Sequence, residues 1–244
     1  IGPSQSDYFQ ATRGGGHGDY RTVVLAPCSI QETVDLMQEA FDIADQYRNP
    51  VILLADGMIG QMMEPIEWHD IPKRELPEKT WATDGHDNKV PHRTISAVFG
   101  DNYVCEEVLN KPLAAKYRLI AANEVRYEEK DTADAEVVLV AYGTMSRVSE
   151  RACEILREQG VRAGLFRPIV LWPYPEARLH ELAAQEQTKC FLSVEMSDGQ
   201  MIDDVRISVA GQKPVSFVGR NGGVVPTPDE IVDAVKKALA EVKA

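Results

Sequence analysis

A glycine-rich loop near the start of the chain combines residue types that could bind an anion and exchange a proton. The segment Gln10–Tyr20 reads QATRGGGHGDY, so four glycines fall within five residues directly after Arg13. Such a run is costly to order and is typical of backbone that approaches a ligand closely or adopts positive φ. A guanidinium binds carboxylates and phosphates at two points, and an imidazole exchanges protons near neutral pH. We therefore predict that Arg13, Gly15, Gly16 and His17 lie near a substrate or cofactor; the alternative is a plain connector.

Two other places follow predicted strands and could also be functional. Asp56 stands at the carboxyl end of the apolar run Val51–Ala55, where open α/β sheets bind their ligands. Gly143, Thr144 and Ser146 lead from another strand into a helix, and free amides at a helix N-terminus can hold an anion. The competing interpretation is structural in both cases. Asp56 would then cap a turn, and Thr144 or Ser146 would cap the helix.

Composition excludes several classes of function. The 244 residues include 38 acidic and 26 basic residues, a formal net charge of −12, which argues against general binding to nucleic acid or anionic membranes. The longest apolar runs have the length of strands, and no signal-peptide pattern opens the chain. We therefore predict a cytoplasmic protein that binds neither nucleic acid nor membrane.

The distribution of cysteine and histidine predicts no metal centre. The four cysteines, Cys28, Cys105, Cys153 and Cys190, are widely separated, unlike the close spacing that holds zinc or an iron–sulfur cluster. Most of them are expected to be small buried hydrophobic residues. The three histidines His69, His86 and His92 share no spacing that would gather them on one ion. Any metal chemistry would belong to another chain.

The pattern of elements predicts an α/β protein. A capping box at Ser29–Glu32 begins a helix that ends near Arg48–Pro50, and its expected apolar face is Ile30, Val34, Met37, Phe41 and Ala44. With the strands before and after it, this helix forms a βαβ unit with parallel strands. Four prolines and several aromatic residues between 65 and 98 indicate an ordered linker or lid, and Asn102–Tyr127 is predicted as a helix broken at Lys111–Pro112.

The rest of the chain alternates strands and helices regularly. Expected strands are Glu136–Ala141, Val161–Phe166, Cys190–Val194 and Val215–Val218, and expected helices follow Gly143, Pro175, Gly199 and Thr227. Alternation of this kind is typical of a parallel sheet covered on both faces. We predict two doubly wound, mainly parallel α/β domains, over residues 1–65 and 131–244, joined by a linker and connecting helix over residues 66–130.

Several sequence blocks carry a family resemblance. They are Gln5–Tyr20, Leu25–Pro27, Arg48–Val51, Ala55–Gly57, Gly60–Pro65, Val140–Gly143, Arg167–Ile169, Leu171–Pro175, Val194–Met196, Gly199–Met201 and Asp204–Arg206. Together they resemble the alpha subunit of thiamine-dependent 2-oxoacid:ferredoxin oxidoreductases, most closely the branched-chain type that acts on 3-methyl-2-oxobutanoate (2-ketoisovalerate). The resemblance spans essentially the whole chain.

The resemblance implies a fold, an activity and partners. The first domain would be the end of a pyrimidine-binding domain and the second would be of the transketolase C-terminal type. Thiamine diphosphate and Mg would be shared with a beta subunit, iron–sulfur clusters would lie only in partner chains, and coenzyme A would take the acyl group. Expected partners are beta, gamma and ferredoxin-like subunits and external ferredoxin.

The same resemblance leaves the catalytic acid unassigned. In this family a carboxylate early in the pyrimidine-binding domain activates the cofactor, and the chain opens at Ile1 in what reads as the middle of a loop. We therefore expect an N-terminally truncated chain with that carboxylate upstream of Ile1, inactive alone. Asp56 and Glu64 are tempting substitutes, although Glu64 would also suit an interface. A non-catalytic interaction or acyl-CoA-binding module is the alternative reading of the chain.

Overall fold

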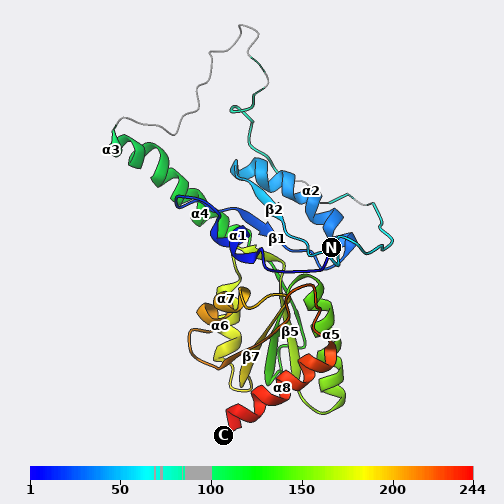
Figure 1. Cartoon of the computed structure of the whole chain (residues 1–244). Helices are drawn as coiled ribbons and strands as arrows, with labels where there is room; N and C mark the ends of the chain where they lie inside the picture. The colour runs from blue at the N-terminus through cyan, green and yellow to red at the C-terminus, as the bar shows by residue number, and fades with distance from the viewer. Residues whose placement is uncertain (69, 72–73, 84, 86–100, 244) are drawn as a thin grey trace.

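The fold consists of two β-sheets with helices packed against them. The computed structural model describes residues 1–68, 70–71, 74–83, 85 and 101–243. A three-stranded sheet has the order β2-β1-β6, and a five-stranded sheet has the order β3-β5-β4-β7-β8. Figure 1 shows the smaller sheet above the larger one, with a long helical rod extending from it. The predicted α/β class with mainly parallel strands is confirmed.

The smaller sheet contains the predicted βαβ unit. Its elements are the short helix α1 (Tyr8–Arg13), β1 (Val23–Leu25), α2 (Ile30–Tyr47), β2 (Val51–Leu53) and β6 (Val170–Trp172). β1 pairs with β2 in parallel and with β6 in antiparallel fashion. β6 comes from the part of the chain assigned to the second domain, so the two sheets are tied together by a strand as well as by packing.

Helix α2 begins where the capping box predicts, but it buries a different face. The Ser29 hydroxyl accepts from the amide of Glu32 at 3.1 Å, and the Glu32 carboxylate reaches back to the amide of Cys28 at 2.7 Å. The buried side chains are Leu36, Ala40, Ile43 and Tyr47, which pack on β1. The predicted apolar face was wrong, since Met37 and Phe41 are 44% and 69% exposed. β2 is also only half-buried, not fully buried as predicted.

The helix predicted between the domains is a continuous rod with one wide turn. It comprises α3 (Asn102–Cys105), the π-helical segment η1 (Glu106–Asn110) and α4 (Lys111–Asn123). The Lys111 amide donates to the carbonyl of Glu106, five residues back, so the rod continues into Pro112 in place of the predicted break. The rod ends before Tyr127, which begins β3.

The larger sheet follows the predicted alternation. Its elements are β3 (Tyr127–Lys130), β4 (Val137–Val140), α5 (Gly143–Glu158), β5 (Ala163–Pro168), α6 (Glu176–Ala184), β7 (Cys190–Glu195), α7 (Met201–Val209), β8 (Val215–Gly219) and α8 (Pro228–Lys243). β4, β5, β7 and β8 are parallel, and β3 is antiparallel to β5. The expected strands and helices are confirmed, but β3 and β6 were missed. At the start of α8, Thr227 and Glu230 form a reciprocal capping box.

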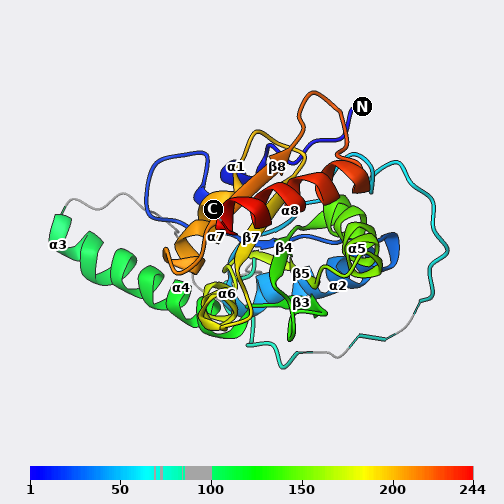
Figure 2. The ribbon, with the colours of Figure 1, turned by 90° about the horizontal axis from the view of Figure 1, so that it is seen from below.

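Two layers of helices enclose this sheet, and the core continues into the smaller one. α5 and α8 pack on one face of the sheet, and α6 and α7 on the other (Figure 2). Tyr8 and Val24 of the smaller sheet's layer belong to the same buried cluster as Val138 and Phe191 of the larger sheet. The two sheets therefore form one packed body.

The segment between β2 and α3 is only partly described. Trp68 is 77% exposed, whereas the ring of Trp81 lies under the guanidinium of Arg48 at 5.1 Å. Arg74 donates to both carboxylate oxygens of Glu124 at 2.5 and 2.8 Å. The residues His69, His86 and His92 lie outside the described part of the chain.

Candidate functional site at the junction of the two sheets

The glycine loop is closed around a tyrosine. Gln10–Arg13 belong to α1 and not to the loop, which corrects the expected start of the loop. The amides of Gly15 and Gly16 donate to the Tyr20 hydroxyl at 2.8 and 3.0 Å. A Cβ at Gly14, whose φ is +80°, would lie 2.9 Å from the Tyr20 ring. The glycines thus let the backbone wrap the tyrosine, and these two amides have an acceptor within the chain.

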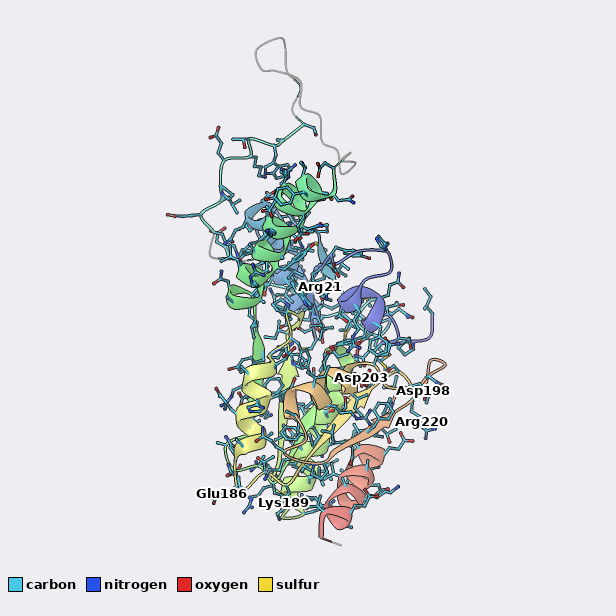
Figure 3. The ribbon with its side chains drawn as sticks, turned by 90° about the vertical axis from the view of Figure 1, so that its left-hand side faces the viewer. Arg21, Glu186, Lys189, Asp198, Asp203 and Arg220 are labelled. Carbon is cyan, nitrogen blue, oxygen red and sulfur yellow. The ribbon has the colours of Figure 1, made fainter. Side chains whose placement is uncertain are left out.

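Arg13 is held by two acidic residues of α7, a helix that packs on the larger sheet. Its guanidinium donates to Asp204 at 3.0 Å, lies 3.7 Å from Asp203 and covers the ring of Phe9 at 4.4 Å. The hydroxyl of Tyr8 donates to the other oxygen of Asp204 at 2.5 Å. Figure 3 shows Asp203 at the end of the second sheet that faces the first. Arg13 therefore fastens α1 to α7, and its charge is balanced inside the chain.

His17, by contrast, is exposed at the edge of a groove. The groove has a volume of about 650 Å³ and is lined by the loop, by α4 and by Trp172. A second groove of about 830 Å³ continues from it and shares Arg21 and Trp172. Arg21, labelled in Figure 3, donates to the carbonyl of Tyr20 at 2.9 Å. Arg13 lines the second groove and His17 the first.

The predicted anion site at the start of α5 holds a carboxylate of the chain itself. One oxygen of Asp56 accepts from the Thr144 amide at 2.9 Å, and the other accepts from the Thr144 hydroxyl at 2.7 Å. The amides of Met58 and Ile59 complete the set at 3.0 and 3.2 Å. Gly143 has φ +55°, and a Cβ there would lie 2.8 Å from the Asp56 carboxylate. Asp56 and Gly143–Thr144 were predicted separately; the structure brings them together, with Thr144 as the donor and Asp56 as the acceptor. Ser146 instead donates to the carbonyl of Gly143.

The ligand crevice of the larger sheet is filled in a similar way. In an open α/β sheet this crevice lies outside the carboxyl ends of two adjacent strands whose following connections run to opposite sides of the sheet. In the larger sheet these strands are β4 and β7. The amide group of Gln5 donates to the carbonyl of Tyr142 and accepts from the amide of Met196, both at 2.9 Å. Glu195, fully buried, accepts from Ser193, Ser197 and three amides at the start of α7. Sequence reasoning missed Gln5 and Glu195; their type gives no signal without the topology.

Glu64 forms a second link between the sheets. Its carboxylate accepts from the Ile30 amide at the start of α2 at 2.9 Å and from Arg147 of α5 at 2.7 Å. These two hydrogen bonds hold the pKa of Glu64 below its usual value of 4.5. The expectation that Glu64 lies at an interface fits this geometry.

An arginine that sequence reasoning missed crosses the same junction. Arg167 on β5 is 7% exposed, and its guanidinium donates to both oxygens of Glu32 at 2.9 Å and to Glu128. Cys28 lies beside this cluster, and burial raises the pKa of its thiol to about 11. Burial also raises the pKa of Cys190 to about 11 and that of Cys153 to about 12. Such thiols remain protonated at neutral pH and are poor nucleophiles.

The described residues contain no group of three or more His, Cys, Asp or Glu side chains that could hold a metal ion. The same part of the chain has no helix long and apolar enough to cross a bilayer. Both carboxylates considered for activating a cofactor are hydrogen-bonded within the chain, Asp56 to α5 and Glu64 to α2 and Arg147. No catalytic step follows from these contacts.

Comparisons with known proteins identify the class. Residues 1–132 match the model described as pyruvate flavodoxin/ferredoxin oxidoreductase, thiamine diphosphate-binding, and residues 135–231 match pyruvate:ferredoxin oxidoreductase core domain II. The chain therefore belongs to the pyruvate flavodoxin/ferredoxin oxidoreductase family, as the sequence blocks predicted.

Two relatives place the chain within this family, and one solved structure shares its fold. It is 44% identical to ketoisovalerate oxidoreductase subunit VorB of Methanothermobacter marburgensis, with 99% of this chain and 67% of that protein covered. It is 32% identical to the 2-oxoglutarate synthase subunit KorA of the same organism, with 95% and 68% covered. A structure of 2-oxoglutarate:ferredoxin oxidoreductase from Magnetococcus marinus, with 2-oxoglutarate, coenzyme A and succinyl-CoA bound, matches with a TM-score of 0.74. At 21% identity, over 98% of this chain and 46% of that one, it supports the fold alone.

The Asp56 link predicts a loss of stability when its carboxylate is removed. Asp56→Ala leaves the amides of Thr144, Met58 and Ile59 without an acceptor in a buried place, so we expect the free energy of unfolding to fall by about 1–3 kcal/mol. Urea unfolding measures this. Asp198→Ala, at an exposed position labelled in Figure 3, serves as the control and should change stability by less than about 0.5 kcal/mol. Equal stability of Asp56→Ala and the wild type would contradict the assignment.

The Glu64 link predicts a stability difference that depends on pH. Because the folded pKa of Glu64 is lowered, its contribution is present above the unfolded pKa and is lost as the pH falls through the folded pKa. Glu64→Gln should therefore be less stable than wild type near pH 7 and should converge with it as the pH falls through the lowered folded pKa of Glu64. Glu186→Gln, at an exposed position, is the matched control and should follow the wild type throughout. A difference that persists unchanged in acid would rule out the carboxylate as its source.

Proposed function

We propose that this chain is a subunit of an enzyme that oxidatively decarboxylates a branched-chain 2-oxoacid to an acyl-CoA and carbon dioxide, with electrons passed to ferredoxin. The observation that carries the proposal is the higher identity to the ketoisovalerate relative, 44%, than to the 2-oxoglutarate relative, 32%, over nearly the whole chain. The matched thiamine diphosphate-binding family over residues 1–132 supports that cofactor for the complete enzyme. Thiamine diphosphate would supply the carbanion chemistry when bound.

The geometry supports a division of labour between subunits. We propose that this chain is the alpha subunit, that thiamine diphosphate and Mg are shared with a beta subunit, and that iron–sulfur clusters lie in partner chains. The support from this chain is that its junction carboxylates are occupied by internal hydrogen bonds. Gamma and ferredoxin-like subunits, external ferredoxin and a cytoplasmic location complete the proposal. This chain would then be inactive alone.

Within that enzyme, we propose that the glycine loop borders the site. His17 and Asp19 are exposed titratable groups of the loop, and both line a groove that continues past Arg21 to Arg13; of the two, only His17 can carry a positive charge toward an anion. Because Gly15 and Gly16 donate to Tyr20, the loop has a defined shape before any ligand binds. A loop held in this way can present His17 to an anionic substrate at a fixed position. Arg13 would act indirectly, through α1.

The substrate class can be tested in the assembled enzyme. We expect kcat/KM for 3-methyl-2-oxobutanoate to exceed that for 2-oxoglutarate by about tenfold or more, because a pocket for an apolar side chain leaves the second carboxylate of 2-oxoglutarate unpaired. Reduction of a viologen in the presence of coenzyme A measures both rates. This chain alone is the control and should give no turnover. A preference for 2-oxoglutarate would overturn the proposed substrate.

The loop predicts a loss of activity without a loss of fold. His17→Ala should lower kcat/KM by roughly ten- to a hundredfold while the melting temperature stays unchanged, since His17 makes no hydrogen bond among the described residues. Arg13→Ala should lower both, because it also removes the link to Asp204. Asp198→Ala, at an exposed position that lines neither groove, is the control and should keep wild-type kinetics. Wild-type kinetics in His17→Ala would show that the loop is only a connector.

A further inference from the structure

The shape of the glycine loop depends on one oxygen atom, the hydroxyl of Tyr20. This hydroxyl accepts from the amides of Gly15 and Gly16 at 2.8 and 3.0 Å. Within the described part of the chain, residues 15–19 make no other hydrogen bond and no ion pair. His17 and the two residues after it are exposed, and a Cβ on Gly18 would meet no atom within 4 Å. Packing therefore does not replace these two hydrogen bonds.

The glycines allow the backbone to come this close to the tyrosine. Gly14 has φ +80°, a conformation that strains residues with a side chain. A Cβ there would also lie 2.9 Å from the Cζ atom and from the hydroxyl of Tyr20, closer than a carbon atom can approach without a shift. The glycine run and Tyr20 therefore form one unit, in which the ring excludes side chains and the hydroxyl binds the amides.

This unit fixes the position of His17 although Tyr20 does not line the same groove. His17 follows Gly16 directly, so holding the Gly16 amide fixes the point at which the imidazole leaves the backbone. His17 lines the groove of about 650 Å³, whereas Tyr20 lines neither that groove nor the one that continues from it. Tyr20 lines a separate cavity of about 520 Å³ together with Ile52 and Leu54. An effect of Tyr20 on a ligand beside His17 must therefore pass through the loop.

We propose that Tyr20 is a positioning residue whose hydroxyl holds the loop so that His17 can bind the anionic substrate. The inference rests on the role given to the glycine loop under the proposed function. A run of glycines has many alternative conformations, so a loop without its acceptor would adopt the binding conformation for only a fraction of the time. A ligand that needs that conformation then binds more weakly in proportion to that fraction.

Tyr20→Phe tests the proposal because it removes the oxygen atom and keeps the ring. In the assembled enzyme, we expect the amides of Gly15 and Gly16 to exchange with deuterium about tenfold faster than in the wild type. The KM for 3-methyl-2-oxobutanoate should rise by about the same factor. kcat should stay near its wild-type value, because saturating substrate selects the ordered loop. Mass spectrometry of peptides that span the loop measures the exchange, and reduction of a viologen measures the kinetics.

Two further variants separate positioning from a general loosening of the fold. Tyr103→Phe is the matched control, because Tyr103 is 72% exposed and its hydroxyl bonds to no residue that the structure describes. It should change neither the exchange of the loop nor KM. The double variant Tyr20→Phe/His17→Ala should have the same kcat/KM as His17→Ala alone, because Tyr20 then has no imidazole to position. A merely structural role for Tyr20 would instead add a second loss to that of His17→Ala.

The exchange measurement keeps this inference separate from the proposed role of the loop, since it does not depend on turnover. Unchanged exchange at Gly15 and Gly16 in Tyr20→Phe would overturn the inference whatever the kinetics of His17→Ala. Faster exchange with a wild-type KM would also overturn it if His17→Ala is slow, because the shape of the loop would then not matter to the substrate. Wild-type kinetics in His17→Ala would overturn the proposed role of the loop itself, and the inference with it.

Discussion

The relative position of the two sheets depends on a buried carboxylate, that of Asp56, which lies at the N-terminus of a helix of the other sheet. Asp56 leaves the carboxyl end of β2 and ends on the amide of Thr144, at the start of α5. A carboxylate that is 8% exposed would be costly if its oxygens were not hydrogen-bonded. Four donors around Asp56 meet this requirement, and two of them belong to the other sheet. Any rotation of one sheet against the other would leave these groups unpaired.

The other polar groups at the junction reinforce this constraint. Arg167 on β5 binds Glu32 in a bidentate manner, and Glu32 also accepts from the Cys28 amide at the start of α2. Gln5 inserts between the strand ends of β4 and β7. Each contact uses a charged or amide group whose geometry is directional, so the junction is specified more tightly than apolar packing alone would achieve. The place where an open sheet would bind a ligand is consequently used to hold the two sheets together.

The amino-acid sequence predicted the helices and strands better than it predicted which of their faces are buried and which segments they contact. The capping box at Ser29 and the strand at Val137–Val140 depend on local patterns, and both were confirmed. The buried face of α2 was not, because Met37 and Phe41 fit a helical stripe as well as Leu36 and Ile43 do, and only the sheet decides between them. β3 was missed because Glu128 and Glu129 make it charged, and it pairs at an edge of the sheet. Asp56 reaches the start of α5 through the way in which the two sheets pack, and the two segments are far apart in the sequence. The sequence therefore predicted an anion at this helix N-terminus but could not show that the anion is the carboxylate of Asp56.

The junction and the helical rod differ in how far their side chains find partners within the described chain. At the junction, polar groups as different as Glu195, Gln5 and Arg167 find hydrogen-bond partners within the chain. Along the rod, by contrast, the apolar side chains of Val104, Val108 and Leu119 are exposed. Apolar side chains that are exposed singly on a helix are common on protein surfaces and place no constraint on its position. The polar contacts at the junction therefore fix how the two sheets sit against each other, and the exposed apolar side chains of the rod add nothing to that geometry.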